Sequence, residues 1–425
     1  MGMSQSSHHL TGHRERRTSP CGGLRGSPPV CPPPPEPCGA ADASRGAGGR
    51  AAPARSTHHR LRGLPAQVVL FVAFLAGCGY QGAAEFTLNT EGREPESVSP
   101  SQQEAIAAAL ERHFGTPDEP RVPSGLPLGL EKLQIAAGPV AGDKRGLRTG
   151  LYRQHCAVCH GISGDGAGAQ AALLNPYPRD FRPGWFKFTS TAGGAKPVPK
   201  DIERVLLRGV PGTAMPSYMT LPQREIDALV EYVRYLSMRG ETELYLFRLV
   251  VDEDEYLPLD MRMVQEDWIE PLGAMWEMAE ELVVEPPERP VVDTPEDWED
   301  SVSRGFELYS SPAAQCVQCH GPYGYGDGEE AQLYDEWNRV KVGMTAEQTR
   351  RLARLYRLPP QQLRPRDFRA GIFRGGGRPE DLYWRIHVGI KGTPMPAAGP
   401  APGSTGVLSP EEIWHVVHYI LSLSQ

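Results

Sequence analysis

Cys-Ala-Val-Cys-His-Gly at residues 156–161 returns as Cys-Val-Gln-Cys-His-Gly at residues 316–321. Two cysteines three positions apart in a helical turn project from one face, and a histidine follows each pair directly. Because 156 residues separate Cys159 from Cys316, the spacing predicts two independent sites rather than one shared site.

Further landmarks accompany each of these segments in the same order, which indicates a duplicated domain. A glycine and a tyrosine precede the first cysteine. A Gly-Asp-Gly loop, a Pro-Arg-Asp-Phe tetrapeptide and a Gly-Thr-x-Met-Pro loop follow the histidine. The first copy has these landmarks at Gly150, Tyr152, Gly164–Gly166, Pro178–Phe181 and Gly212–Pro216, and the second at Gly305, Tyr309, Gly326–Gly328, Pro365–Phe368 and Gly392–Pro396.

Each copy ends in a predicted amphipathic helix. In the second copy, Ser409 is a suitable N-cap with a proline at the first turn. The second copy is also longer, and its Thr345-Ala346-Glu347-Gln348 is a capping-box pattern that predicts a surface helix. The apolar positions of the terminal helices are Ile226, Leu229, Val230, Val233 and Leu236 in the first copy, and Ile413, Val416, Val417 and Ile420 in the second.

An acidic connector joins the two copies. Residues 240–300 hold twenty acidic residues and three arginines, a balance of −17. Because charge is sorted along the chain in this way, no single basic surface indicates a nucleic-acid partner. The run 285–290 (Glu-Pro-Pro-Glu-Arg-Pro) is typical of a stiff, exposed linker. Apolar residues at steps of three and four predict an amphipathic helix packed on a domain, and they are Trp268, Leu272, Met275, Trp276, Ala279 and Leu282.

The amino-terminal region carries a predicted export signal. Arg60 and Arg62 precede the apolar run 68–77, which is shorter than the about 20 residues of a bilayer span and is typical of a secretory signal. Leu75-Ala76-Gly77-Cys78 resembles the lipobox of bacterial lipoproteins, in which the cysteine is acylated and becomes the first mature residue. This pattern predicts an exported protein on the periplasmic side, tethered to a membrane through Cys78. A plain signal peptide or a short buried segment is the alternative.

The predicted organisation is an all-α chain with two tandem domains. We expect one helix in the arm that precedes them, at 101–114, opened by Ser101 with Glu104 and carrying Ile106, Leu110 and Phe114. The segments are a disordered leader with signal and lipobox at 1–78 (removed up to 77), the arm at 79–140, domain 1 at 141–239, the acidic, partly helical connector at 240–299 and domain 2 at 300–425.

The Cys-x-x-Cys-His signature predicts two covalently bound haem c groups. Both thiols of a pair add to the vinyl groups of one porphyrin, and the histidine that follows is carried beneath the iron as the proximal ligand. Zinc is the competing interpretation, although zinc ribbons hold their cysteine pairs within about 15–20 residues of each other. Redox-active dithiols do not account for the histidine. The predicted attachment residues are Cys156, Cys159 and His160, and Cys316, Cys319 and His320.

A methionine in each Gly-Thr-x-Met-Pro loop is the candidate sixth ligand. A thioether is a soft ligand that favours reduced iron and raises the potential. The proline that follows Met215 and Met395 restricts each methionine to an extended conformation. A gap-filling core methionine is the alternative. The rival ligands are Met219 in the first site, Met344 in the second, and His387, His415 and His418, of which the last two are expected to be ordinary helix histidines.

Residues 145–237 and 300–424 resemble class I cytochrome c domains, and the pair resembles the dihaem cytochrome subunits of haem–copper oxidases. The resemblance implies two tandem cytochrome c-like helical domains, each with terminal helices that cross beside a haem crevice. The lipid-type anchor, the acidic connector and the arm depart from the family pattern. The resemblance places Gly150 and Gly305 at the close crossings, with Tyr152 and Tyr309 near the contacts.

Two haems with both axial positions filled predict electron transfer. We expect a relay between a respiratory membrane complex and an oxidase or soluble carrier, as an electron carrier or oxidoreductase subunit rather than a stand-alone enzyme. The alternative is a dihaem peroxidase or a dehydrogenase of a small sulfur compound, which needs an open sixth position. Arg179 and Arg366 are candidate partners of haem propionates, or else belong to a turn with an internal Arg–Asp contact. The acidic connector either docks a basic redox partner or is a solvated face.

Overall fold

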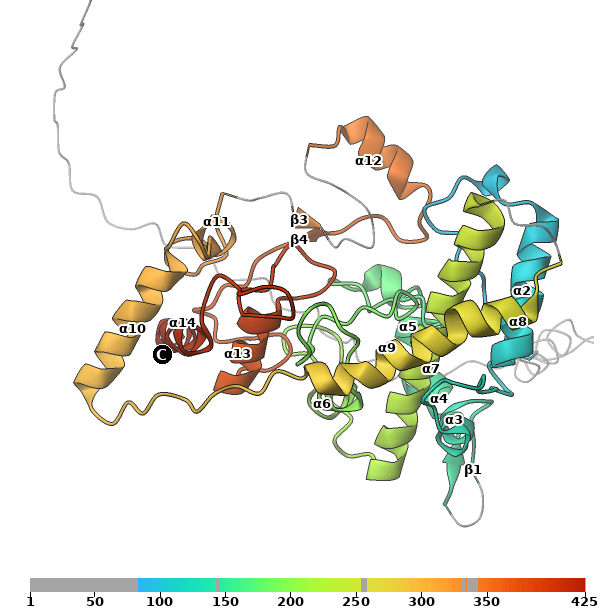
Figure 1. Cartoon of the computed structure of the whole chain (residues 1–425), viewed down its shortest axis with the longest axis horizontal. Helices are drawn as coiled ribbons and strands as arrows, with labels where there is room; N and C mark the ends of the chain where they lie inside the picture. The colour runs from blue at the N-terminus through green and yellow to red at the C-terminus, as the bar shows by residue number, and fades with distance from the viewer. Residues whose placement is uncertain (1–82, 143–145, 254–257, 330–332, 335–342, 425) are drawn as a thin grey trace, which may run out of the picture. The chain divides into compact units, whose positions relative to one another are not determined.

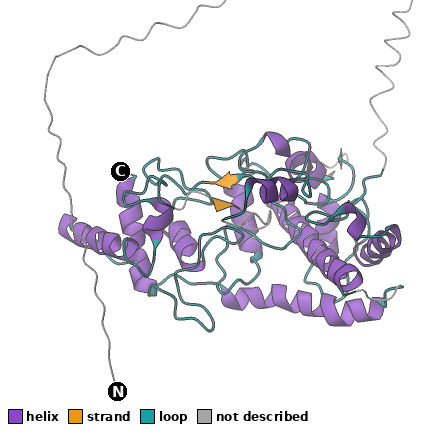
Figure 2. Ribbon diagram, turned by 90° about the horizontal axis from the view of Figure 1, so that it is seen from above, coloured by secondary structure: helices purple, strands orange, loops and turns teal. Residues whose placement is uncertain are grey.

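A computed structural model describes residues 83–142, 146–253, 258–329, 333–334 and 343–424, all within one compact unit of the chain (Figure 1). The predicted leader, signal and lipobox, with Cys78, lie outside the described residues. Apart from two pairs of two-residue strands, the regular structure is helical (Figure 2), which confirms the all-α class. No helix among the described residues is long and apolar enough to cross a bilayer.

The elements follow one another in chain order. The helices are α2 (Pro100–Phe114), α3 (Leu130–Ala136), α4 (Leu151–His155), α5 (Ala157–His160), α6 (Pro199–Arg208), α7 (Gln223–Phe247), α8 (Met261–Val264), α9 (Glu270–Met278), α10 (Pro295–Tyr309), α11 (Cys316–His320), α12 (Ala346–Ala353), α13 (Pro379–Val388) and α14 (Pro410–Leu423). The strands are β1 (Ala141–Gly142), antiparallel to β2 (Arg148–Thr149), and β3 (Leu333–Tyr334), antiparallel to β4 (Gln362–Leu363). Short 3-10 or π turns are η1 (Pro95–Ser97), η2 (Ala171–Leu173), η3 (Arg248–Asp252), η4 (Gln265–Ile269) and η5 (Ala279–Leu282).

In the second copy, the first and last helices cross at a glycine, as predicted. Helices α10 and α14 meet at Gly305, where a Cβ atom would come within 2.0 Å of the carbonyl oxygen of His415. Tyr309 lies at the same crossing, with its ring centroid 5.1 Å from that of Tyr419. Ser409 caps α14 as expected. The predicted apolar face of this helix is buried, at Ile413, Val416, Val417 and Ile420.

In the first copy, the prediction that Gly150 lies at a helix crossing is wrong. The equivalent helix is divided into α3 and α4 by the β1–β2 hairpin, and both parts contact α7. Gly150 precedes α4 with a φ of 72°, and a Cβ atom there would come 2.4 Å from the carbonyl oxygen of Pro139. The turn out of the hairpin therefore requires this glycine. Tyr152 keeps its expected place, with its ring centroid 4.9 Å from that of Tyr232 on α7.

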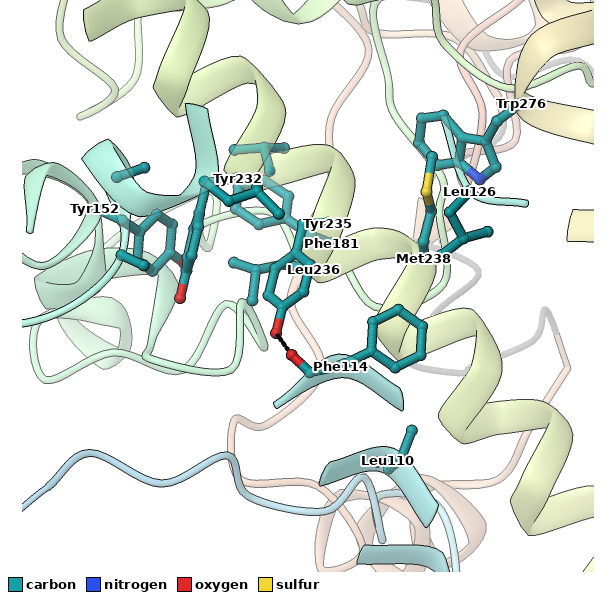
Figure 3. Packing of buried hydrophobic residues seen from close by; sticks show 14 of the residues in the cluster. Leu110, Phe114, Leu126, Tyr152, Phe181, Tyr232, Tyr235, Leu236, Met238 and Trp276 are labelled. Carbon is teal, nitrogen blue, oxygen red and sulfur yellow. Dashed lines mark hydrogen bonds between the residues drawn. The ribbon is translucent and has the colours of Figure 1, made fainter. Parts of the chain in front are cut away.

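Helix α7 is the centre of the first core. All five predicted apolar positions between Ile226 and Leu236 are buried, and the helix continues beyond residue 239 to Phe247. The arm packs on it through α2, and the hydroxyl of Tyr235 donates to the carbonyl oxygen of Phe114 at 2.6 Å (Figure 3). The predicted core positions of α2, which are Ile106, Leu110 and Phe114, are buried.

The start of α2 differs slightly from the prediction. Ser99 rather than Ser101 is the N-cap, and its hydroxyl accepts from the backbone amide of Gln102 at 3.3 Å. The side chain of Gln102 in turn accepts from the amide of Ser99 at 2.9 Å. Proline can occupy the first turn of a helix because the amides there need no intrahelical partner, so Pro100 moves the cap two residues towards the N-terminus.

Charged side chains of α7 are buried and obtain partners from the arm. Glu243, which is fully buried, accepts from the backbone amide of Asn89 at 2.6 Å and from Arg239 at 3.1 Å. The guanidinium of Arg239 lies 4.1 Å from the centre of the Phe86 ring. Buried charges are costly unless they are paired and hydrogen-bonded. The arm therefore supplies polar and aromatic partners that domain 1 lacks by itself.

The acidic connector packs on the first core, as predicted. Leu272, Trp276 and Ala279 are buried, and the indole nitrogen of Trp276 donates to Glu241 of α7 at 3.0 Å. Met275 is 42% exposed, so its assignment to the buried face is wrong. Val264 and Ile269, which were not predicted, are buried instead. The π turn η4 between α8 and α9 shifts the register of the buried face.

The run 285–290 is not the exposed linker that its composition predicts. The indole of Trp384 donates to the carbonyl oxygen of Val284 at 2.8 Å, and that of Trp414 donates to Pro287 at 2.9 Å. Arg289 donates to Nε2 of His418 at 2.8 Å. Burial lowers the pKa of His418 to about 4, so its neutral imidazole can accept this bond. The run is thus a strap across α13 and α14.

The predicted surface helix of the second copy is present as α12. Its N-cap is Thr345, whose hydroxyl accepts from the amide of Gln348 at 3.2 Å. None of its side chains is buried, so this helix adds nothing to the core.

We expect Gly305→Ala to destabilise the second domain by about 1–3 kcal/mol, because the new methyl group collides with the backbone of α14. At an exposed helix position the same change stabilises by about 1 kcal/mol. The sign of the change in unfolding free energy therefore shows whether the helices are in close contact at residue 305. Denaturant unfolding of the whole protein would measure the change. Ser303→Ala, at an exposed position of α10, is the control. An unchanged or raised midpoint for Gly305→Ala would show that the crossing tolerates a side chain.

Candidate functional site

The two Cys-x-x-Cys-His segments fold as the short helices α5, for which Cys156 is the N-cap, and α11. Cys156 is buried in the first hydrophobic core and Cys316 packs against the second. Burial raises the pKa of these thiols to about 12 and about 11. All four cysteines of the pairs are free thiols, and within the described ranges no three His, Cys, Asp or Glu residues lie together as a metal site. The pairs stand in separate cores, as two independent sites require.

A backbone carbonyl orients each proximal histidine. Nδ1 of His160 lies 2.9 Å from the carbonyl oxygen of Arg179, and Nδ1 of His320 lies 3.4 Å from that of Arg366. Because a carbonyl can only accept, Nδ1 carries the proton and Nε2 keeps the free lone pair of the imidazole. Burial lowers the pKa of both histidines, that of His320 to about 4, which keeps both rings neutral and able to bind a metal.

The phenylalanine of Pro-Arg-Asp-Phe covers the face of each imidazole. The ring of Phe181 stacks on His160 with centroids 4.6 Å apart, and that of Phe368 stacks on His320 at 4.5 Å. Sequence reasoning did not assign these residues a role. Their recurrence at the fourth position of a repeated motif was the signal that could have found them.

The two copies also share a hydrogen bond made by the tyrosine before each cysteine pair. The hydroxyl of Tyr152 donates to the carbonyl oxygen of Gly161 at 2.8 Å, and that of Tyr309 donates to Gly321 at 2.6 Å. Both tyrosines are buried, and each glycine directly follows a proximal histidine. Each tyrosine therefore links the end of the histidine turn to the helix that precedes it, which is α4 in the first copy and α10 in the second.

The Gly-Thr-x-Met-Pro loops have the same hydrogen bonds in both copies. In the first, the hydroxyl of Thr213 donates to Val210 at 2.8 Å and accepts from the amide of Met215 at 3.1 Å. In the second, Thr393 donates to Ile390 at 2.7 Å and accepts from Met395 at 3.3 Å. The amides of Val210 and Ile390 each return a bond of 3.1 Å to the methionine carbonyl. The threonine thus closes each loop around its methionine.

His160 and Met215 line one crevice in the first copy. Its walls are largely apolar, and its lining residues include Cys159, His160, Phe181, Leu206, Met215 and Val233. The rival Met219 is 71% exposed and lies outside this lining. A thiol, an imidazole with a free Nε2 and a thioether converge here on an apolar space, which is the donor set and the environment that a covalently attached haem requires.

The histidines that are rival ligands in the second copy already have hydrogen-bond partners. His387 is buried, with Nε2 2.9 Å from the carbonyl oxygen of Pro400. His415 and His418 share the hydroxyl of Ser301, at 2.8 and 2.7 Å. Met344 lies next to Thr345, the N-cap of α12. The histidines are thus engaged in structural hydrogen bonds, as expected for those on α14.

The internal Arg–Asp contact of the tetrapeptide involves a different arginine from the one expected. Asp180 accepts from the backbone amide, Nε and Nη2 of Arg182, at 2.8–3.0 Å. Arg179 lines the first crevice and donates to the carbonyl oxygen of Lys391 in the second copy at 3.1 Å. In the second copy, the carboxylate of Asp367 accepts from the amide of Arg369 at 2.9 Å.

Two family models match the chain in the two copies. One is described as cytochrome c oxidase, cbb3-type, subunit III, and matches residues 148–233. The other is described as cytochrome c and matches residues 302–424. The chain is a dihaem c-type cytochrome. Its two cytochrome c domains bind two haem c groups covalently and serve electron transfer.

The dihaem cytochrome is also similar to one chain of the reducing HAO-like protein complex of Kuenenia stuttgartiensis. The two chains are 26% identical, and the match covers 65% of this chain and 94% of the other with a TM-score of 0.45. No curated protein matches the dihaem cytochrome.

We expect Tyr152→Phe and Tyr309→Phe each to destabilise the protein by about 0.5–1.5 kcal/mol. Each change removes the shorter of two hydrogen bonds to a carbonyl oxygen and leaves only the bond from the amide of Gly164 or Gly324, at 3.3 and 3.4 Å. Thermal unfolding followed by circular dichroism would measure the loss. Tyr323→Phe, which removes a hydroxyl from a side chain that is 60% exposed, is the control and should change stability little. Equal losses of stability in all three variants would show that the two buried hydrogen bonds do not stabilise the protein more than an exposed hydroxyl does.

Proposed function

We propose that the dihaem cytochrome relays single electrons through two His–Met haems, between a respiratory membrane complex and an oxidase or soluble carrier. The observation that carries this proposal is the equal construction of the two methionine loops. Each loop is closed by the same threonine bonds, and the first faces His160 across an apolar crevice. A site built twice in this way fits a carrier that holds one electron in each domain.

The residues that would hold the two haems form two equal sets. Bound haem c supplies one-electron chemistry, and its axial ligands set the potential. The chain's own contribution is to fix one proximal imidazole through a backbone carbonyl, to hold one thioether in a closed loop and to exclude water with apolar walls. The proposed sets are Cys156, Cys159, His160 and Met215 in the first domain, and Cys316, Cys319, His320 and Met395 in the second.

A dihaem enzyme is the alternative function. A peroxidase or a sulfur-compound dehydrogenase needs one iron with an open or displaceable sixth position and acid–base groups beside it. The closed loops at Met215 and Met395 favour the relay, because both positions would be filled by side chains that the threonine bonds hold in place.

We expect Met215→Ala and Met395→Ala each to convert one of the two ferric haems from low spin to high spin. Each variant should lose about half of the far-red charge-transfer band of methionine-ligated haem and lower the potential of one haem, because a thioether favours reduced iron. Optical and magnetic circular dichroism spectra of the oxidised protein would measure this change.

Met219→Ala is the matched control for these variants. It removes the neighbouring, exposed methionine and should leave both bands unchanged. Loss of a band in Met219→Ala would make that residue the ligand. A wild-type spectrum with one high-spin haem per chain would contradict the relay and favour the enzyme.

We also propose that the mature protein is exported and tethered to a membrane by lipid on Cys78. The support is the sequence Leu75-Ala76-Gly77-Cys78 directly after a short apolar run and a basic flank. One acyl chain binds a membrane only marginally, whereas several chains on one residue give stable anchoring. Such a tether would keep the relay close to membrane-bound redox partners.

Cys78→Ser is expected to move the cytochrome from the membrane fraction to the soluble periplasmic fraction, or to leave it unprocessed. Fractionation and intact mass of the mature chain would show this, since the acyl groups add mass to Cys78. Cys38→Ser, in the same leader, is the control and should change neither property. Membrane retention of a correctly processed Cys78→Ser protein would refute lipid tethering.

A further inference from the structure

The two cytochrome c domains meet through equivalent segments. Arg179 of the first domain donates to the carbonyl oxygen of Lys391, and a Cβ atom on the adjacent Gly392 would come 3.2 Å from its Nη2. Reciprocally, a Cβ atom on Gly212 of the first domain would come 3.4 Å from Nη1 of Arg366. Each Pro-Arg-Asp-Phe arginine therefore lies against the methionine loop of the other domain. We call this contact the seam.

The contacts at the seam follow a near two-fold relation. Phe188 and Gly375 are equivalent residues, each seven positions after the phenylalanine of its tetrapeptide. They also touch, since a Cβ atom on Gly375 would come 2.4 Å from the ring of Phe188. Contact between equivalent residues is what a two-fold relation produces at its axis. The residues just before them, Lys187 and Arg374, are therefore also equivalent and lie next to the axis.

Arg374 crosses the seam into the first haem crevice. It lines the same cavity as Cys159, His160 and Met215, and every other described lining residue belongs to the first domain. Its Nε atom is buried. Its equivalent, Lys187, lines this cavity as well.

The charge of this crevice is unusual for its otherwise apolar walls. Arg179, Lys187 and Arg374 place three cations around one cavity, and the carboxylate of Asp201 in its wall is bonded to the hydroxyl of Ser190 at 2.8 Å. A haem carries two propionate carboxylates, and a guanidinium pairs with a carboxylate in a planar, often bidentate geometry. Cations that line the crevice fit those two carboxylates.

We infer that Arg374 of the second domain binds a propionate of the haem in the first domain, so that the second domain completes the first haem site and raises its potential. A cation beside the haem stabilises the reduced state, which has one positive charge fewer at the iron. This inference rests on the haem ligands assigned under the proposed function, but not on the identity of any redox partner.

The test is a mediated redox titration of the purified, full-length protein. The first haem is the component that Met215→Ala displaces. We expect Arg374→Gln to shift the reduction equilibrium of that component about tenfold towards the oxidised form, or about 59 mV for a one-electron couple. Arg374→Lys keeps the charge and should shift it less than threefold.

Arg369→Gln is the matched control, because it removes the same charge from the same segment at an exposed position. It should leave the first haem within threefold. An unshifted first haem in Arg374→Gln, or a shift of the second haem alone, would overturn the inference. If Met215→Ala displaces neither component, the ligand assignment fails instead, which separates the two failures.

A second measurement covers the case in which Arg374→Gln does not fold. Resonance Raman spectra report the propionate bending modes of each haem directly. In Arg374→Lys, the mode of the first haem should move, since an ammonium ion and a guanidinium bind a carboxylate differently. A purely structural role for Arg374 would leave it in place, and that outcome would refute the proposal.

Discussion

One hydrogen bond orients each proximal imidazole, from Nδ1 to the carbonyl oxygen of the arginine in Pro-Arg-Asp-Phe. The bond fixes the tautomer, and the same tetrapeptide places a phenylalanine on the ring. In the first domain the carbonyl lies 19 residues beyond the histidine, and in the second it lies 46 residues beyond. Helix α12 of the intervening insertion has no buried side chain, and the contact between His320 and Arg366 is present beyond it. The same constraint on the imidazole is therefore met with two very different lengths of intervening chain.

The first domain also depends on segments that lie outside the repeat. Helix α7 carries Glu231, Arg239, Glu241 and Glu243 in buried positions. Charges in a core are stabilised only where their hydrogen bonds are complete. The amide of Gly129 donates to Glu231, that of Asn89 to Glu243, and the indole of Trp276 to Glu241. Arm and connector therefore supply donors to three buried carboxylates of one long helix, which gives a physical role to two segments that depart from the cytochrome c pattern.

Local features of the sequence predicted much of this structure. The repeat, the cap at Ser409, the buried face of α14 and the places of Tyr152 and Tyr309 all follow from residues close together in sequence or from the family resemblance. Gly150 was misassigned because a glycine before a helix serves a turn and a crossing equally well. Residues 285–290 were misassigned because composition does not show that Trp384 of α13 and Trp414 of α14 offer hydrogen-bond donors to this part of the backbone. The place of Arg374 in the first haem crevice could not be predicted, since the other residues that line this crevice lie in the first domain, far earlier in the sequence.

The seam shows what a tandem chain can do that a pair of identical subunits cannot. At the axis of a symmetric dimer, one residue type must meet itself. Two phenylalanines at the position shared by residues 188 and 375 would collide, since even one Cβ atom on Gly375 comes 2.4 Å from the ring of Phe188. Two glycines would leave a void that protein interiors rarely keep. With both copies on one chain, each position can change alone, and Phe188 fills the space that Gly375 leaves. The same freedom allows position 187 to be lysine and position 374 arginine, so the two haem sites need not be electrostatic copies of each other.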